Sequence, residues 1–331
     1  MISKTIKNAV IFGCKGPRLT EVEFDFFKET LPFGFILFSR NIINSKQVNE
    51  LCQSLRDAVG WNAPILIDQE GGRVQRIKPP LALDRLPPLD EAQKAGQNAK
   101  SIFKLRFSEI ANELLSLGID FNCAPVLDIA RPTTHRFLRN RCYGVNKSDV
   151  ISLGRVAYDA LKSNGVFPII KHMPGHGCAS HDSHFELPVV KVSKKELLAN
   201  DFAVFRAFCD AEIAMSAHVL FEAIDPYSAA STSKKLIDII RDDIKFSGLL
   251  ISDDISMAAL PGDIKKRTTN LIEAGNDVIL HCNGKLVEMK EIIDSGVVQN
   301  TLTLSRMASV IEERKKIEHT KIENLESPQS S

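Results

Sequence analysis

Short apolar runs of four or five residues recur along the chain, and longer stretches with helical spacing separate them. Runs rich in β-branched and aromatic residues suit strands that are buried on both faces, as in a parallel sheet. Eight such runs are present: Ala9–Phe12, Phe35–Phe38, Pro64–Ile67, Ile119–Cys123, Val166–Ile170, Ile213–Ser216, Leu249–Ser252 and Asp277–Leu280. The pattern therefore predicts eight buried strands.

Capping signals mark where the helices between these runs begin and end. The predicted N-caps are Asn44, Ser193 (with Glu196 completing a capping box) and Ser233, and Gly275 ends a helix over Ile264–Ala274. Strands alternating with helices predict an α/β protein with a single (β/α)8 barrel of the TIM type over residues 1–315. A doubly wound open sheet is the alternative, although no GxGxxG sequence follows a strand. Residues 316–331 are polar, and we expect a disordered tail there.

Composition narrows the classes of function. The formal net charge is +1, which gives no electrostatic argument for binding nucleic acid or an anionic membrane. Seven scattered cysteines without a CxxC pair argue against a disulfide framework and favour a reducing compartment. No apolar run is long enough for a signal peptide or a membrane span. We therefore expect a soluble cytoplasmic protein.

Polar or glycine-rich residues follow each predicted strand, and in a barrel these positions share the C-terminal face, where active sites lie. The densest group is Lys171–His184, KHMPGHGCASHDSH, which contains four of the eight histidines. Pro174 and the glycines on either side of His176 exclude a long helix. This loop suits either a metal site or a general acid/base in which Asp182 holds the His184 imidazole. A loop whose histidines only cap and hydrogen-bond is the structural alternative.

Two acidic clusters stand at other predicted strand ends. Asp253 and Asp254 end the run Gly248–Ile251, where a carboxylate can act as a nucleophile or merely cap a turn. Asp68 and Glu70 lie near Arg73 and Arg76, as an ion-pair network or as a sugar-binding group.

Six segments, in this order along the chain, resemble family 3 glycoside hydrolases of the bacterial β-N-acetylglucosaminidase branch. They are GFILFSRNI, DQEGGRVQR, FNCAPVLDIA, KHMPGHGCASHDSH, GLLISDDISM and EAGNDVIL. The similarity extends from about residue 8 to residue 290. Met173 replaces a frequent Phe, and Asn140 stands where the family more often has an acidic residue before Arg141.

The resemblance implies a retaining exo-enzyme that removes terminal, non-reducing β-linked N-acetylglucosamine, without a metal or redox cofactor. Asp253 would be the nucleophile, His184 the acid/base and Asp182 its partner. The implied substrate-binding residues are Asp68, Arg76, Arg141, Lys171 and His172. The implied substrate is GlcNAc-1,6-anhydro-MurNAc, with or without its peptide, in peptidoglycan recycling. A metal-dependent barrel hydrolase, a β-GlcNAc phosphorylase and a non-catalytic sugar-binding barrel remain alternatives.

Overall fold

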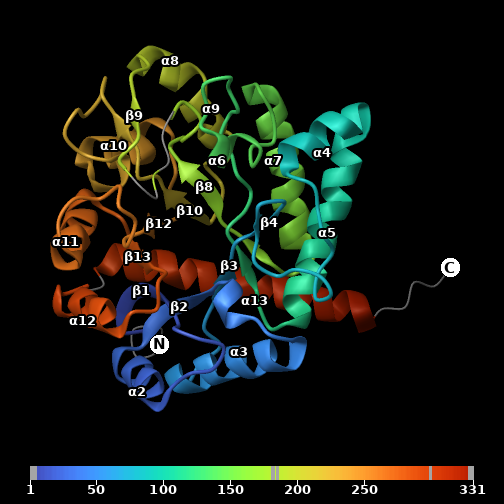
Figure 1. The fold of residues 1–331 in the computed structure, drawn as a ribbon, viewed down its shortest axis with the longest axis vertical. Coiled ribbons are helices and arrows are strands. Elements are labelled where there is room, and N and C mark those ends of the chain that lie inside the picture. The colour runs from blue at the N-terminus through green and yellow to red at the C-terminus, as the bar shows by residue number, and fades with distance from the viewer. Residues whose placement is uncertain (1–5, 180–182, 184–185, 298–299, 327–331) are drawn as a thin grey trace.

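The apolar runs form the parallel strands of a central sheet, and the helices lie around it (Figure 1). The computed structural model describes residues 6–179, 183, 186–297 and 300–326, with side chains described as far as residue 317. The strands of this sheet are β1 (Asn8–Gly13), β2 (Pro32–Leu37), β3 (Ile65–Ile67), β6 (Phe121–Asn122), β7 (Phe167–Pro168), β8 (Ile170–Met173), β10 (Ile213–Ser216), β12 (Leu249–Asp254) and β13 (Val278–His281). Each of the eight predicted runs overlaps a strand.

The sheet closes into a barrel because one segment of chain pairs with both of its ends. The strand order is β7-β6-β3-β2-β1-β13-β12-β10-β8, and every neighbouring pair is parallel. Only Ile169 separates β7, which pairs with β6, from β8, which pairs with β10. The Ile169 N–H donates to Asn122 O at 2.9 Å. The two short strands are thus one barrel strand, so the (β/α)8 fold is confirmed and the open-sheet alternative is wrong.

Most of the helices lie between successive strands, and α3, α8 and α10 begin at the predicted caps Asn44, Ser193 and Ser233. They are α2 (Glu21–Thr30), η1 (Ser39–Asn41), α3 (Ser45–Val59), α4 (Pro88–Ala95), η2 (Gly96–Asn98), α5 (Ala99–Ser116), α6 (Arg136–Arg139), α7 (Lys147–Ser163), α8 (Lys194–Ala199), α9 (Asp201–Arg206), η3 (Ala230–Thr232), α10 (Lys234–Asp238), η4 (Ile239–Asp243), α11 (Ile264–Ala274), α12 (Leu286–Asp294) and α13 (Thr301–Glu326). Asn44 Oδ1 accepts from Gln47 N at 2.9 Å, and Ser193 Oγ accepts from Glu196 N at 3.3 Å. Gly275 ends α11 with φ +110°.

Two small sheets were not predicted, and both belong to loops at the carboxyl ends of barrel strands. β4 (Gln69–Gly71) pairs antiparallel with β5 (Val74–Gln75), and β9 (Val189–Val190) pairs parallel with β11 (Leu220–Phe221). Strands of two or three residues are too short to produce a readable alternation of apolar and polar positions. These two small sheets affect only nearby parts of the chain, because they fix the loops that follow β3, β8 and β10.

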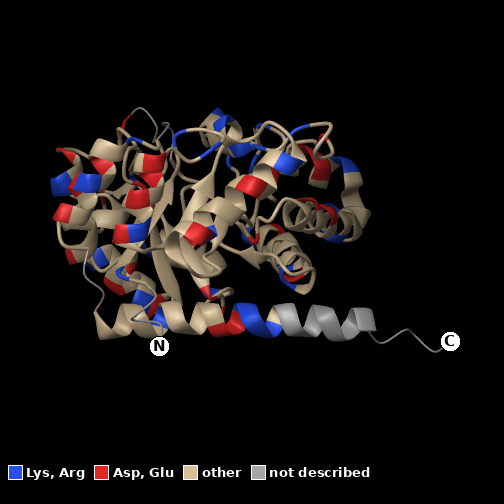
Figure 2. Ribbon diagram, turned by 90° about the horizontal axis from the view of Figure 1, so that it is seen from below, with Lys and Arg blue, Asp and Glu red and all other residues tan. Residues whose placement is uncertain are grey.

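The long helix α13 crosses the opposite end of the barrel (Figure 2). Its Arg314 Nη1 donates to Asn62 O at 2.7 Å, just before β3, and its Arg306 pairs with Asp277 at 2.7 Å, just before β13. The helix continues past residue 315, where the sequence predicts that the barrel ends, as far as Glu326. The division of the chain at residue 315 stays a prediction. Within the described ranges, no helix is both long enough and apolar enough to span a membrane.

Candidate active site

A polar cavity of about 170 Å³ opens at the carboxyl ends of the barrel strands. Its walls come from six of the strand ends, and they include Phe38 after β2, Asp68 after β3, Lys171 and His172 on β8, Met215 on β10, Asp253 on β12 and Leu280 on β13. Parallel strands bring residues that are far apart in sequence to the same face. The polar positions at the predicted strand ends therefore converge on this cavity.

A chain of alternating charges forms the floor of the cavity. Lys171 Nζ lies 2.7 Å from Asp68 Oδ1 and 2.6 Å from Glu70 Oε1. Arg76 Nη2 donates to the other oxygen of Asp68 at 2.8 Å. Arg141 binds Glu70 through two parallel hydrogen bonds, both 2.8 Å long. Since every carboxylate here has two cationic partners or a bidentate one, the network is held rigidly while remaining ionised.

The pKa values of these groups follow from burial and from their partners. Burial alone would raise the pKa of Glu70, but Arg141 and Lys171 outweigh it and lower the pKa to about 2. Burial opposes ionisation of Asp68 too, yet Lys171 and Arg76 hold its pKa well below the usual range. Burial lowers the pKa of Lys171, and the two carboxylates more than restore it, so it lies above its ordinary value. At neutral pH the floor thus offers fixed donors and acceptors side by side.

Asp128 joins the floor of the cavity to the histidine-rich loop. Its Oδ2 accepts from the Nδ1–H of His172 at 2.7 Å, and its Oδ1 accepts from the backbone N–H of His176 at 2.5 Å. Burial and the neighbouring His172 lower the pKa of His176 to about 4. His176 Nε2 lies 3.4 Å from the hydroxyl of Ser183, which also lines the cavity. One buried carboxylate therefore orients both histidines.

The two acids at the end of β12 have different surroundings. Asp254 accepts from Ser256 N at 3.0 Å, from Ser256 Oγ at 2.6 Å and from Cys282 N at 3.1 Å. Asp253 lines the cavity, and its Oδ1 accepts from the backbone N–H of Asp254 at 2.8 Å. Both acids line the cavity, but the carboxylate of Asp254 is engaged by the turn that follows it. The role of Asp253 as nucleophile stays a prediction.

The structure brings together six of the eight predicted site residues, namely Asp68, Arg76, Arg141, Lys171, His172 and Asp253. Asp182 and His184 lie outside the described residues, so their roles stay predictions. Ser183, which stands between them in the sequence, is described and lines the same cavity.

Sequence reasoning placed Glu70 in a charged cluster but not among the site residues, and it did not single out Asp128, although both are almost fully buried within the charge network. Their one signal is position, because each follows a predicted strand by a few residues.

Metal ligation was the alternative use of the histidine-rich loop. In the parts of the chain that the structure describes, no three His, Cys, Asp or Glu side chains lie close enough together to hold a metal ion. His181, Asp182 and His184 fall outside those parts.

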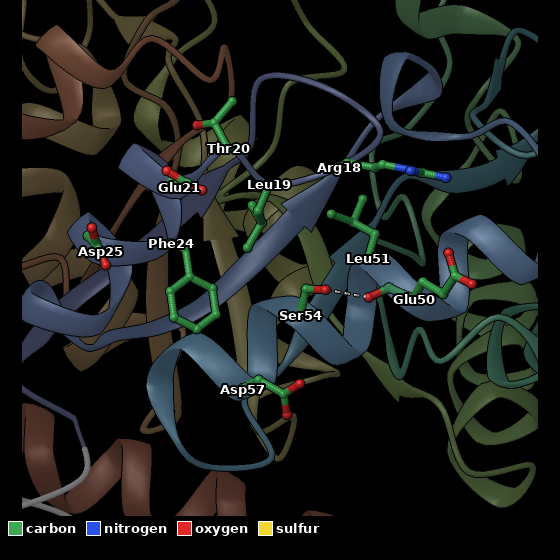
Figure 3. A pocket seen from close by; sticks show the side chains of 10 residues that line it. All are labelled: Arg18, Leu19, Thr20, Glu21, Phe24, Asp25, Glu50, Leu51, Ser54 and Asp57. Atoms are coloured by element: carbon green, nitrogen blue, oxygen red, sulfur yellow. Dashed lines mark hydrogen bonds between the residues drawn. The ribbon is translucent and has the colours of Figure 1, made fainter.

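A larger cavity, of about 550 Å³, lies between the outer helices α2 and α3 (Figure 3). Leu19, Phe24 and Leu51 supply its apolar surface, and Arg18 and Glu50 are among its charged residues. None of the predicted site residues lies there. Size alone therefore does not identify the site, whereas convergence of buried charged groups does.

Comparison with known proteins agrees with this geometry. The sequence matches the glycosyl hydrolase family 3 N-terminal domain over residues 18–313. It is 32% identical over 287 residues to a β-hexosaminidase of Stenotrophomonas maltophilia, with 84% of each chain covered. It is 31% identical over 283 residues to a β-hexosaminidase of Haemophilus influenzae, covering 83% of this chain and 80% of that one. The fold is similar to native NagZ from Neisseria gonorrhoeae, with a TM-score of 0.82, 31% identity and coverage of 92% and 90%.

Proposed function

The chain belongs to glycosyl hydrolase family 3, and from that premise we propose that it is a retaining exo-β-N-acetylglucosaminidase. The observation that carries the proposal is the cavity at the strand ends, where the Asp253 carboxylate faces a floor of buried, paired charges. Asp253 acts as the nucleophile, His184 as the acid/base and Asp182 as the partner that orients the His184 imidazole. The related chains that carry the name β-hexosaminidase support this assignment.

The floor suits a sugar because hydroxyl groups both donate and accept hydrogen bonds. Asp68 supplies ionised acceptor oxygens, while Lys171 and Arg76 beside it supply donors. Arg141 and His172 extend this set along the cavity wall. Because the groups are already paired with one another, they need no reorganisation when the ligand binds. We propose that they hold the terminal N-acetylglucosamine next to Asp253.

The reaction proceeds in two steps with balanced proton transfers. In the first step, an oxygen of Asp253 forms a bond to the anomeric carbon while the glycosidic bond breaks, and the His184 imidazolium gives its proton to the leaving oxygen. In the second step, neutral His184 takes a proton from water, and the water oxygen displaces Asp253. The backbone N–H of Asp254 bonds to Asp253 Oδ1 and so fixes the orientation of the attacking carboxylate. Two displacements at one carbon give retention of configuration.

We propose a cytoplasmic substrate derived from peptidoglycan, GlcNAc-1,6-anhydro-MurNAc with or without its peptide. Two observations support the choice. The chain covers 90% of NagZ from Neisseria gonorrhoeae, to which its fold is similar. All seven cysteines are free thiols, which fits a reducing compartment.

Replacing the proposed nucleophile tests the assignment. Asp253→Ala should lower release of nitrophenol from 4-nitrophenyl β-GlcNAc by at least about 10⁴-fold, because no other group forms the glycosyl-enzyme bond. Asp242→Ala, an exposed acid on η4, is the control and should leave the rate within about twofold. Near wild-type turnover by Asp253→Ala would refute the assignment.

Two further assays address the alternatives. A chelator should leave turnover unchanged, and activity that is lost with chelator and restored by zinc would identify a metal-dependent hydrolase instead. Free GlcNAc should be the product in both phosphate and non-phosphate buffer, whereas GlcNAc 1-phosphate in phosphate buffer would identify a phosphorylase.

A further inference from the structure

The first part of the histidine-rich loop, Pro174–Ala179, which we call the loop stem, is fastened to a part of the protein that does not line the cavity. Three residues make the attachment, Arg131, Thr134 and Asp201, and we call them the clasp. We propose that the clasp is a positioning element that sets the place of the loop stem and, through it, of the acid/base at the end of the loop. This inference rests on the proposed function.

Hydrogen bonds tie the loop stem to the segment after Asp128. Thr134 Oγ1 donates to Gly177 O at 2.5 Å, and the backbone N–H of His135 donates to Ala179 O at 3.1 Å. The same Thr134 hydroxyl accepts from Arg131 N at 2.8 Å, so it closes the turn that presents the Arg131 side chain. The loop stem is thus held at two of its carbonyls, those of Gly177 and Ala179.

An ion pair completes the clasp from the other side. Arg131 binds Asp201 through two parallel bonds, Nη1 to Oδ1 at 2.9 Å and Nη2 to Oδ2 at 2.7 Å. Asp201, at the start of α9, is only 2% exposed, and Cys178 Sγ lies 3.6 Å from its Oδ2. A bidentate pair fixes direction as well as distance. The clasp therefore joins three parts of the chain: the loop stem, the segment after Asp128, and α9.

The glycines of the PGHG sequence allow the backbone of the loop stem to lie directly against the clasp. A Cβ on Gly177 would lie 2.3 Å from Ile129 O and 3.1 Å from Arg131 Nη1. A Cβ on Gly175, whose φ is +137°, would lie 2.9 Å from Asp201 Cβ. Both positions require glycine because of close approach, not only because of a turn. The spacing of these glycines is thus matched to Arg131 and Asp201.

The loop stem connects the clasp to the cavity. His176, within the stem, bonds through its backbone to Asp128 and through its ring to Ser183, the residue that directly precedes His184. Within the described residues, neither Arg131 nor Asp201 lines the cavity. They therefore act on the reaction without lining the cavity, and the loop stem is their direct connection to it. A shift of the loop stem would change proton delivery more than it changes the contacts of Asp253.

This predicts a specific kinetic signature. General-acid catalysis matters most for poor leaving groups and little for good ones. Arg131→Met should lower kcat/KM about 10- to 100-fold for phenyl β-GlcNAc and no more than about 3-fold for 2,4-dinitrophenyl β-GlcNAc, with 4-nitrophenyl β-GlcNAc between them. The measured quantity is the steepness with which log kcat/KM falls as the leaving group becomes poorer, because kcat/KM reports only the first step.

Matched variants separate positioning from general damage. Arg155→Met removes another bidentate Arg–Asp pair, with Asp210, that does not touch the loop, and it should leave the steepness unchanged. Arg131→Lys, which keeps the charge, should recover part of the loss. If Arg131→Met fails to fold, Thr134→Val is compared with Thr134→Ser as a second test. Neither of these substitutions removes the Arg131–Asp201 ion pair.

The outcomes distinguish the two proposals. If the wild-type protein hydrolyses none of the three glycosides, the proposed function fails. If the wild-type protein hydrolyses them but Arg131→Met and Thr134→Val reduce all three equally, or reduce none, the function stands and the clasp proposal is overturned.

Discussion

The two ends of the barrel use the same kinds of buried ion pair for different purposes. At the end covered by α13, Asp277 accepts from Arg241 and Arg306, both at 2.7 Å, and from Leu250 N at 2.9 Å. At the other end, Lys171 and Asp68 are paired just as closely, yet they line a cavity. Pairs that a helix covers hold the fold together. Pairs that remain at an opening present their other donors and acceptors to a ligand.

Among the substitutions that test this comparison, the largest effect is expected from removing the central cation of the open end. Lys171→Met leaves Asp68 and Glu70 without their shared partner, and it also removes a donor from the sugar site. We expect kcat/KM for 4-nitrophenyl β-GlcNAc to fall about 10³-fold. Steady-state kinetics, with thermal unfolding measured in parallel, checks this. A fall in stability with normal kinetics would show that the open end has the same purpose as the covered one.

A second substitution removes a charged partner at the end of the barrel that α13 covers. Asp277→Asn leaves two arginines without their carboxylate, and we expect the free energy of unfolding to fall by about 3 kcal/mol, since one partner of a mostly buried network is removed. Denaturant unfolding measures this effect. Once folded, the Asp277→Asn variant should have a kcat/KM within about twofold of the wild-type value. Lost activity in a fully folded variant would contradict the proposed separation of the two ends.

The smallest effect is a pH dependence of stability that comes from His176. Its pKa is about 4 in the folded protein, below its ordinary value, because of burial and His172. Between the two pKa values the unfolded chain binds a proton that the folded chain does not, so stability is lost as the pH falls. Acidification from pH 6.5 to 5 should cost about 1–2 kcal/mol in the wild type. His176→Asn should lack this component, and an identical pH slope in denaturant unfolding would disprove it.

The comparison also shows what the sequence could predict. Apolar runs located all eight barrel strands, because a strand buried on both faces must be continuously apolar. Capping residues such as Asn44 and Ser193 located helix starts, because the first turn needs side-chain acceptors. Local chemistry determined these features. The split between β7 and β8 was not predictable, because it depends on which neighbour each half of the strand pairs with.

The candidate site was predicted only in part for the same reason. Asp253, Lys171 and His172 could be found because they follow the predicted apolar runs and because their motifs resemble a family. Glu70, Asp128 and the pair Arg131–Asp201 act through partners that are at least 44 positions away in the chain. A single sequence contains no signal for such pairings, and only the fold brings these groups together.

The central claim is hydrolysis of β-linked N-acetylglucosamine with retention. It is tested most directly by incubating the wild-type protein with 4-nitrophenyl β-GlcNAc and, separately, with 4-nitrophenyl β-glucoside, while NMR follows the anomer that is released first. The account predicts that GlcNAc appears as its β-anomer before mutarotation and that the glucoside is left intact. Initial release of the α-anomer, or equal cleavage of the glucoside, would contradict it.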